Sequence, residues 1–267
     1  MTAMTGTGRP AVHFHHREAV SRVIRTMRER LDEPWTLTRM AQVAFLSRFH
    51  FSRVFRQVTG APPGRFLSAM RMAEARRLVV ASRMTVIDIC TTVGYSSLGT
   101  FTTQFTEQVG VGPGRLRQLG EAHGDRPVGQ LVEEREQPSA GGVVTGVVRV
   151  PPGTAPRLVL IGLFPTRLAQ GRPASCTTVR GAGEFRITAV PDGSYHLLAC
   201  AHPVAVTVKD VLAGSADPDA WVGVAAQPVV VRQGRAGGPV TVGLEPSRPT
   251  DLPILSGLPV LPVAAQS

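Results

Sequence analysis

The feature that most constrains this chain is a short pattern that occurs twice. Residues 43–55 read VAFLSRFHFSRVF and residues 93–105 read VGYSSLGTFTTQF, an offset of 93 − 43 = 50. An apolar residue, an aromatic residue, a serine and two phenylalanines recur in the pairs Val43/Val93, Phe45/Tyr95, Ser47/Ser97, Phe51/Phe101 and Phe55/Phe105. The match continues through Gly60/Gly110, Pro63/Pro113, Gly64/Gly114 and Arg65/Arg115. The repeat predicts one local structure that is built twice.

Apolar residues at helical spacing predict that the region from Arg17 to about Gln118 is all-α. Serines should cap the second helix of each repeat, and glycines should end it. The expected helices cover residues 17–31, 37–44, 47–59, 64–81, 85–93 and 97–109, and Pro113 begins a last short one. A short helix, a tight turn and a capped second helix form a helix-turn-helix, whose second helix enters the DNA major groove.

The helix expected over residues 64–81 joins the two units. About 18 residues at a rise of about 1.5 Å give a rod of about 27 Å. Two reading helices on one face of DNA must lie one helical turn apart, about 34 Å. The rod and the packed cores together can span that distance, so the doubled motif predicts a chain that reads two successive major grooves.

The positive charge is concentrated in the same half of the chain. Residues 1–127 hold 18 Arg and 9 Asp+Glu, which gives 18 − 9 = +9, whereas residues 128–267 hold 11 Lys+Arg and 10 Asp+Glu, which gives 11 − 10 = +1. All the basic residues of the first half are arginines, whose forked guanidinium suits phosphate and guanine. This asymmetry favours a polyanionic partner.

Residues 17–118 resemble the DNA-binding domain of the arabinose-regulator (AraC) family of bacterial transcription factors. The most specific part is VGYSSLGTFTTQFTEQVGVGPGRLR, with Gly94-Tyr95-Ser96-Ser97, Phe101, Phe105, Gly110 and Pro113; Ala41, Ser47, Phe51, Phe55, Gly60 and Pro63 fit the first half. The resemblance implies a monomeric seven-helix domain that binds two adjacent major-groove segments and regulates transcription. It also implies double-stranded DNA as a partner, together with RNA polymerase or another transcription component.

Helix geometry and the family pattern together give candidate DNA contacts. In the first reading helix, Arg53 is expected to recognise guanine, Ser52 a base edge and Phe49 a thymine methyl group, whereas Arg48 and Arg56 are expected to bind phosphates. The alternative for these arginines is simple solvation. In the second helix the outward candidates are uncharged, so this half should contribute less specificity; they are Leu98, Gly99, Thr100, Thr103 and Gln104. Arg115 and Arg117, near the start of the last helix, are further candidates for phosphate contacts.

The rest of the chain has a different composition. Residues 120–140 are polar and rich in helix breakers, as in a linker, and a cut within 121–140 should leave residues 1–120 folded and able to bind DNA. Residues 141–246 hold short β-rich runs separated by turns, which predicts an all-β Greek-key sandwich. Residues 1–16 are expected to be a flexible tail, and residues 247–267 a Pro-rich tail.

Part of the β-rich region, residues 143–202, resembles the carboxypeptidase regulatory-like domain, a transthyretin-type β-sandwich. The motif is GEFRITAVPDGSYHL, with Phe185, Ile187, Tyr195 and Leu197 expected in a hairpin and core and a turn at Pro191-Asp192-Gly193. Such domains bind or brace and carry no catalytic chemistry. A small-molecule effector such as a sugar, a protein partner and self-association all remain open for this domain.

Other classes of function find little in the sequence. His196, His202, Cys200 and Asp210 do not form a catalytic motif, so no enzyme is expected. The odd, widely spaced cysteines (Cys90, Cys176, Cys200) favour free thiols, and HFHH at residues 13–16 lacks the partners of a metal site, so no cofactor or metal is expected. No run of 18 apolar residues and no secretory signal occur, so the cytoplasm is the expected compartment.

From the doubled motif, the charge and the resemblance together, a sequence-specific transcription regulator is predicted. The alternative is a ligand- or protein-binding β-sandwich that the basic half tethers to DNA non-specifically.

Overall fold

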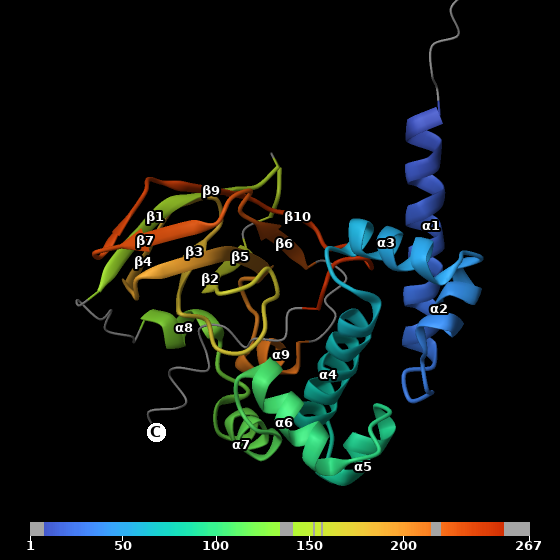
Figure 1. Ribbon diagram of the computed structural model, residues 1–267. Helices are drawn as coiled ribbons and strands as arrows, with labels where there is room; N and C mark the ends of the chain where they lie inside the picture. The colour runs from blue at the N-terminus through green and yellow to red at the C-terminus, as the bar shows by residue number, and fades with distance from the viewer. Residues whose placement is uncertain (1–7, 134–140, 152, 156, 215–219, 254–267) are drawn as a thin grey trace, which may run out of the picture.

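The computed structural model describes residues 8–133, 141–151, 153–155, 157–214 and 220–253. The helices of the first half (Figure 1) are α1 (Gly8–Glu29), α2 (Leu37–Ala44), α3 (Arg48–Thr59), α4 (Pro63–Ala81), α5 (Val86–Thr92), α6 (Leu98–Val109), α7 (Pro113–His123) and α8 (Val128–Glu133). Their bounds confirm the helices expected from the periodicity, with two exceptions: α8 lies in the segment predicted to be a linker, and α1 starts earlier than expected. Helix α1 begins at Gly8, so residues 8–16 are not the flexible tail that was predicted. Pro10 lies in the first turn, where a missing backbone N–H costs no helical hydrogen bond.

The caps expected for the two reading helices are present. Ser47 Oγ accepts the N–H of His50 at the start of α3, and Ser97 Oγ accepts the N–H of Thr100 at the start of α6. Both helices end at a glycine in the left-handed region, Gly60 at φ 77° and Gly110 at φ 94°. These caps satisfy backbone groups that an uncapped helix end leaves without partners.

The helical half has two separate cores joined by one helix. The first core collects α1, α2 and α3 around Phe51 and Phe55. The second collects α5, α6 and α7 around Phe101 and Phe105. Helix α4 takes part in both, with Phe66, Leu67 and Met70 in the first core and Met72, Ala75 and Val79 in the second. The connecting helix is therefore packed at both ends.

The C-terminal half is a curled β-sheet with an inserted helix. Its elements are β1 (Gly142–Arg149), β2 (Arg157–Phe164), β3 (Ser175–Arg180), β4 (Gly183–Val190), β5 (Gly193–Pro203), α9 (Val208–Ala213), β6 (Trp221–Val224), β7 (Val229–Arg232), β8 (Arg235–Ala236), β9 (Val240–Gly243) and β10 (Glu245–Pro246). Hydrogen bonds give the order β10-β6-β5-β7-β8-β1-β4, with β2 between β3 and β5, and β9 parallel to β1. The β-rich character is confirmed, but a Greek-key sandwich is not, and α9 means that the region is not all-β.

The expected hairpin around Asp192 is wrong, although its residues do enter the core. Phe185, Ile187, Tyr195 and Leu197 are all buried in the β-core. However, β4 pairs with β1, whereas the start of β5 pairs with β7. The Asp192 carboxylate accepts the backbone N–H groups of Gln233 and Gly234, at 2.7 and 3.0 Å, which ties this turn to the end of β7. The turn therefore connects strands with different partners.

Strand β2 is buried on both faces because it lies between the sheet core and the helical core. Its residues alternate: Val159, Ile161 and Leu163 belong to the β-core, whereas Leu158, Leu160 and Phe164 belong to the second helical core. Strand β5 alternates in the same way. Successive strand residues point to opposite faces, so one strand can serve two cores. The second helix-turn-helix unit and the β-sheet thus share one hydrophobic core.

The segment expected to be a linker is largely structured. It contains the end of α7 and all of α8, while residues 134–140 lie outside the described part of the chain. Backbone N–H groups of Val128, Val208 and Lys209 donate to the carbonyls of Val206, Arg126 and Gly124, respectively, at 2.9–3.0 Å. Composition indicated a linker because the segment is polar, but its backbone is satisfied by the β-domain. Of the Pro-rich tail, residues 247–253 are described, and Leu252 packs against both helical cores.

Candidate nucleic-acid interface

Helix α3 presents a basic outer face. Its buried apolar residues lie on one side of the helix, so its arginines lie on the opposite side. Phe51, Val54 and Phe55 are at most 2% exposed, whereas Phe49 is 86% exposed. The outer residues border one shallow hollow, which is lined by Leu37, Arg48, Phe49, Ser52, Arg53, Arg56 and Gln57. The structure thus brings together all five residues predicted for this helix.

The chemistry of this face suits nucleic acid. Its three arginines, Arg48, Arg53 and Arg56, are exposed, and α3 contains no acidic residue. A guanidinium can donate two parallel hydrogen bonds to guanine or to phosphate. Phe49 offers an exposed apolar ring between these charges, and apolar side chains can contact the thymine methyl group.

Sequence reasoning missed two residues of this face, Leu37 and Gln57. Gln57 follows Ser52, Arg53 and Arg56 on the outer face, and helical spacing continued by one residue would have included it. Leu37 is 42% exposed at the start of α2, although its place in the apolar stripe of that helix is typical of a core residue. No signal in the sequence separates an apolar residue at the edge of a groove from one inside a core.

Helix α6 presents a smaller, uncharged face. Leu98, Gly99, Thr100 and Thr103 are exposed, as expected. Thr100 Oγ1 lies 3.2 Å from the Oγ of the capping Ser97. The helix contains no Lys or Arg, and its one charged residue is the exposed Glu107.

The structure corrects the predicted outward orientation of Gln104. Its Oε1 accepts hydrogen bonds from Tyr95 Oη at 2.8 Å and from Ser68 Oγ at 3.3 Å, and the residue is half-buried. The repeat contains the signal that would have shown this: at the offset of 50, Gln104 matches Val54, which faces the first core. Gln104 joins α6 to the connecting helix.

The two arginines near the start of α7 have different surroundings. Arg115 is exposed in the first turn of the helix, where a phosphate contact was expected. Arg117 instead donates to the carbonyls of Val79 and Met84, at 3.2 and 2.6 Å. It fastens the end of α4 and the following loop with two of its donors, and the phosphate contact of Arg117 stays a prediction.

Arg71 on α4 holds the first unit to the second. Its Nε and Nη2 donate to the carbonyls of Leu31 and Glu33, at 3.1 and 2.8 Å, and its guanidinium lies 5.7 Å from the ring centroid of Tyr95. Burial lowers the pKa of Arg71, while Tyr95 and Asp32 oppose this shift. Gly94 is needed beside it, since a Cβ at this left-handed position would lie 2.7 Å from Arg71 Nη2.

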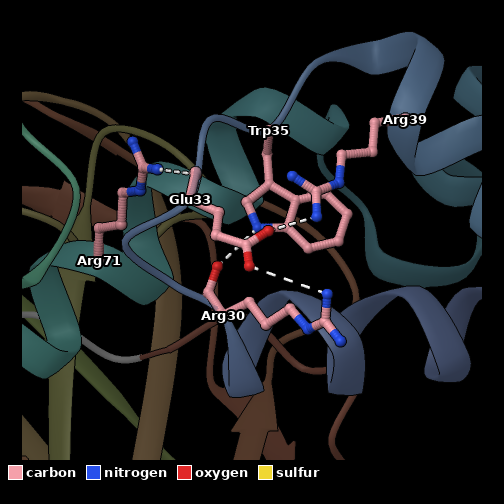
Figure 2. A network of polar contacts seen from close by, with 5 residues as sticks. All are labelled: Arg30, Glu33, Trp35, Arg39 and Arg71. Carbon is pink, nitrogen blue, oxygen red and sulfur yellow. Dashed lines mark hydrogen bonds and ion pairs between the residues drawn. The ribbon is translucent and has the colours of Figure 1, made fainter.

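Figure 2 shows how the loop that receives Arg71 is itself held in place. The Glu33 carboxylate pairs with Arg39 and, at 3.8 Å, with Arg30. Arg39 also lies over the ring of Trp35, whose Nε1 donates to the carbonyl of Arg30 at 2.8 Å. The loop between α1 and α2 therefore offers Arg71 two fixed carbonyls, which limits the relative movement of the two units.

The HFHH segment and the three cysteines lie in helices and strands, apart from the outer face of α3. The HFHH segment lies in α1, and the ring of His16 meets that of His50 edge-on, 5.3 Å away. Cys90, Cys176 and Cys200 form no disulfide with one another, and burial raises the pKa of Cys200 to about 12, opposed by Arg76. A thiol with this pKa is not a nucleophile near neutral pH. No described helix is long and apolar enough to cross a membrane.

Comparisons with known proteins agree with this geometry. Residues 40–119 match the family model described as "Helix-turn-helix domain". The chain is 32% identical over 96 residues to the RCS-specific HTH-type transcriptional activator RclR of Escherichia coli K12, covering 36% of this chain and 34% of that protein. It is 34% identical over 108 residues to the transcriptional regulator Rob of Salmonella typhimurium, covering 39% and 36%. The chain thus spans about a third of the length of these relatives.

Among solved structures, one similar chain is the DNA-binding domain of AdpA, a global transcriptional factor, in complex with a target DNA. It has a TM-score of 0.38 and 29% identity, covering 41% of this chain and 97% of that one. Another is a transcriptional regulator with an AraC-type DNA-binding domain from Chromobacterium violaceum, with a TM-score of 0.38 and 22% identity, covering 40% and 94%. From the family match, the curated relatives and the doubled, capped helix pairs, we conclude that residues 40–119 are a helix-turn-helix domain.

Proposed function

We propose that this chain is a sequence-specific DNA-binding transcription regulator that inserts α3 and α6 into successive major grooves. The observation that carries this proposal is the outer face of α3, where three exposed arginines surround an exposed phenylalanine on a capped, rigidly packed helix. In this proposal Arg53 reads guanine, Ser52 and Phe49 contact base edges, and Arg48 and Arg56 bind phosphates.

The second unit supports the same proposal through its relation to the first. Helix α4 has 19 residues, or about 28 Å at a rise of about 1.5 Å per residue, and it is buried in both cores. Gly99, Thr100 and Thr103 would lie at the second groove, where they can contact bases or phosphates but bring no charge. Arg115 would bind a phosphate at its edge. RNA polymerase or another transcription component would be the second partner.

Selection of bound duplexes from a random pool, followed by affinity measurements against scrambled duplexes, tests this function. We expect two conserved half-sites about 10 base pairs apart and a specificity ratio of about 10³ or more. A specificity ratio near one would overturn the proposal of a sequence-specific regulator. It would favour the alternative, a β-domain tethered to DNA by charge alone. The same affinity measurements, repeated in the presence of each compound of a small-molecule library, would test whether the β-domain binds an effector. Its likeness to a carboxypeptidase regulatory-like sandwich remains a prediction.

A further inference from the structure

The two reading helices differ in charge at matched positions of the repeat. At the offset of 50, the three arginines of α3 correspond to uncharged residues of α6, in the pairs Arg48/Leu98, Arg53/Thr103 and Arg56/Thr106. Gln57 corresponds to Glu107, so α6 also carries an acidic residue at a position where α3 carries a neutral one. Helix α6 therefore lacks the positive charges that α3 carries, and Arg115 of α7 is the exposed arginine nearest to it along the chain.

A loop of the β-domain lies against this end of α6. The backbone N–H of Gly171, in the loop between β2 and β3, donates to the carbonyl of Gln108 at 2.6 Å. Gln170 Nε2 donates to Gln108 Oε1 at 3.4 Å, and Arg172 Nε donates to the carbonyl of Gly110 at 3.2 Å. The approach is close: a Cβ on Gly110 would lie 3.1–3.3 Å from atoms of Gly171 and Arg172. The contact is thus specific and involves both side chain and backbone.

The loop carries two exposed arginines, Arg167 and Arg172. Within the described residues, neither has an acidic side chain in ion-pair distance. Leu168 and Ala169, between them, are buried, which anchors the loop. Arg172 therefore lies beside Gly110, three residues before Pro113 and the first turn of α7, where Arg115 is exposed.

The dimensions of DNA place this end of the helix near phosphates. Helix α6 has 12 residues, or about 18 Å at a rise of about 1.5 Å, whereas the major groove is about 12 Å wide. A reading helix whose N-terminal residues contact bases therefore extends to the wall of the groove, where helix-turn-helix domains also contact the backbone.

We propose that Arg167 and Arg172 of the β-domain bind the DNA backbone beside the second reading helix and replace the charges that α6 lacks. This inference rests on the proposed function, because it assumes that α6 faces duplex DNA. It assigns the β-domain a direct part in the DNA interface: the β2–β3 loop completes the second reading unit. The contacts are with phosphates, so they should add affinity without sequence preference.

The test uses the full chain and measures binding by fluorescence anisotropy at several salt concentrations. The variants are Arg167→Ala, Arg172→Ala and the double variant, and the matched control is Arg186→Ala, which removes an exposed arginine of the same domain on β4. Removal of one phosphate-binding arginine should reduce the magnitude of the slope of log affinity against log salt by about 0.9. The double variant should therefore show a reduction of nearly 2 and bind selected and scrambled duplexes more weakly by the same factor, while the control matches the wild type.

Two results would overturn the inference. One is a double variant with the affinity and salt slope of Arg186→Ala. The other is a change confined to Arg172→Ala together with a lower melting temperature, which would mean that only the hydrogen bond to Gly110 matters. Failure of the proposed function is distinguishable, because it would appear in the wild type as equal affinity for selected and scrambled duplexes. The salt slope of the variants on scrambled DNA would still decide the phosphate contacts.

Discussion

At the scale of single residues, the arginines of the helical half fall into two groups that composition does not separate. Those on α3 are exposed and available to a ligand, whereas Arg71 and Arg117 donate to backbone carbonyls within the protein. Arg76 is 4% exposed against the β-domain, and its burial lowers the pKa to about 10, so the group stays protonated at neutral pH. The charge of +9 therefore overstates what the surface can offer to DNA.

Among the exposed arginines, Arg53 and Arg56 should behave differently. Arg53→Ala should cost about 1–3 kcal/mol on the preferred site and relax the preference at one or two positions. Arg56→Ala, which removes the same charge from the same helix, should weaken binding to all sequences alike. Affinities for a panel of single-base variants of the site would check this. Uniform weakening by Arg53→Ala would show that Arg53 binds phosphate instead.

Asp192 gives a pH-dependent contribution to stability. The backbone N–H groups of Gly234 and Gln233 lower the pKa of this carboxyl. A lowered pKa means that the stabilisation is present above the unfolded-state value of about 3.9 and is lost as pH falls through the lower folded-state value. Asp192→Asn should thus be less stable than the wild type by a constant amount at pH 5 to 7, and the difference should shrink below about pH 4. Urea unfolding across this range is the measurement; a difference that grows towards acid would contradict it.

At the scale of elements, the relative position of α3 and α6 depends on the contacts that hold α4 to the two units. Arg71→Ala should lower the free energy of unfolding by about 1.5–3 kcal/mol, since this substitution removes hydrogen bonds from a charged group to two fixed carbonyls. Arg77→Ala is the matched control on the same helix. Arg77 pairs at the surface with Glu74, so its removal should cost less than about 1 kcal/mol. Chemical denaturation of both variants would measure the two losses in free energy of unfolding. Equal losses would mean that Arg71 does not join the units.

The same fastening should matter for DNA carrying both half-sites. Removal of the Arg71 side chain removes its contacts with the α1–α2 loop and with Tyr95, so the spacing of α3 and α6 is held less firmly, by the packing of α4 in the two cores. Affinity for a duplex with both half-sites should then fall more than affinity for a duplex with one. An equal fall on both duplexes would indicate general destabilisation.

At the scale of the whole molecule, the second reading unit and the β-domain form one body. Leu158, Leu160 and Phe164 of β2 lie in the same core as Phe101 and Phe105. A chain that ends at residue 133 would expose the helical side of this core to water. Burial of one such side chain contributes about 1.5–3 kcal/mol, so the second unit should lose most of its stability.

This expectation replaces the simpler one that the helical half is separable. Thermal unfolding of the truncated chain, followed by circular dichroism, should show an early loss of part of the helical signal, while the first unit melts later. Addition of the separate fragment 141–267 should raise the temperature of the early transition. A truncated chain whose helices melt together at the temperature of the full chain would show that the shared core contributes little.

Much of the helical half could be predicted because its signals are local. Ser47 and Ser97 cap helices, Gly60 and Gly110 end them, and the phenylalanines four residues apart fall on one face, whatever the rest of the chain does. These rules depend on backbone geometry within a few residues. The outer face of α3 followed from the same spacing.

What the sequence could not supply is which surfaces meet. The continuous apolar run of β2 indicated burial on both faces only once a second core was known to lie there. Gln104 and Arg117 are polar, and only their neighbours decide whether they face water or a carbonyl. The polar segment after Gly120 is packed because the β-domain satisfies its backbone.

The sequence by itself determined the two capped helix pairs, their basic first face and the β-rich character of the second half, because each depends on contacts between residues close in the chain. Only the tertiary structure decided that the second unit shares its core with the sheet and that Arg172 lies at the end of α6. Those arrangements depend on how surfaces distant in sequence fit each other, and the free energy of that fit is not encoded in any local pattern.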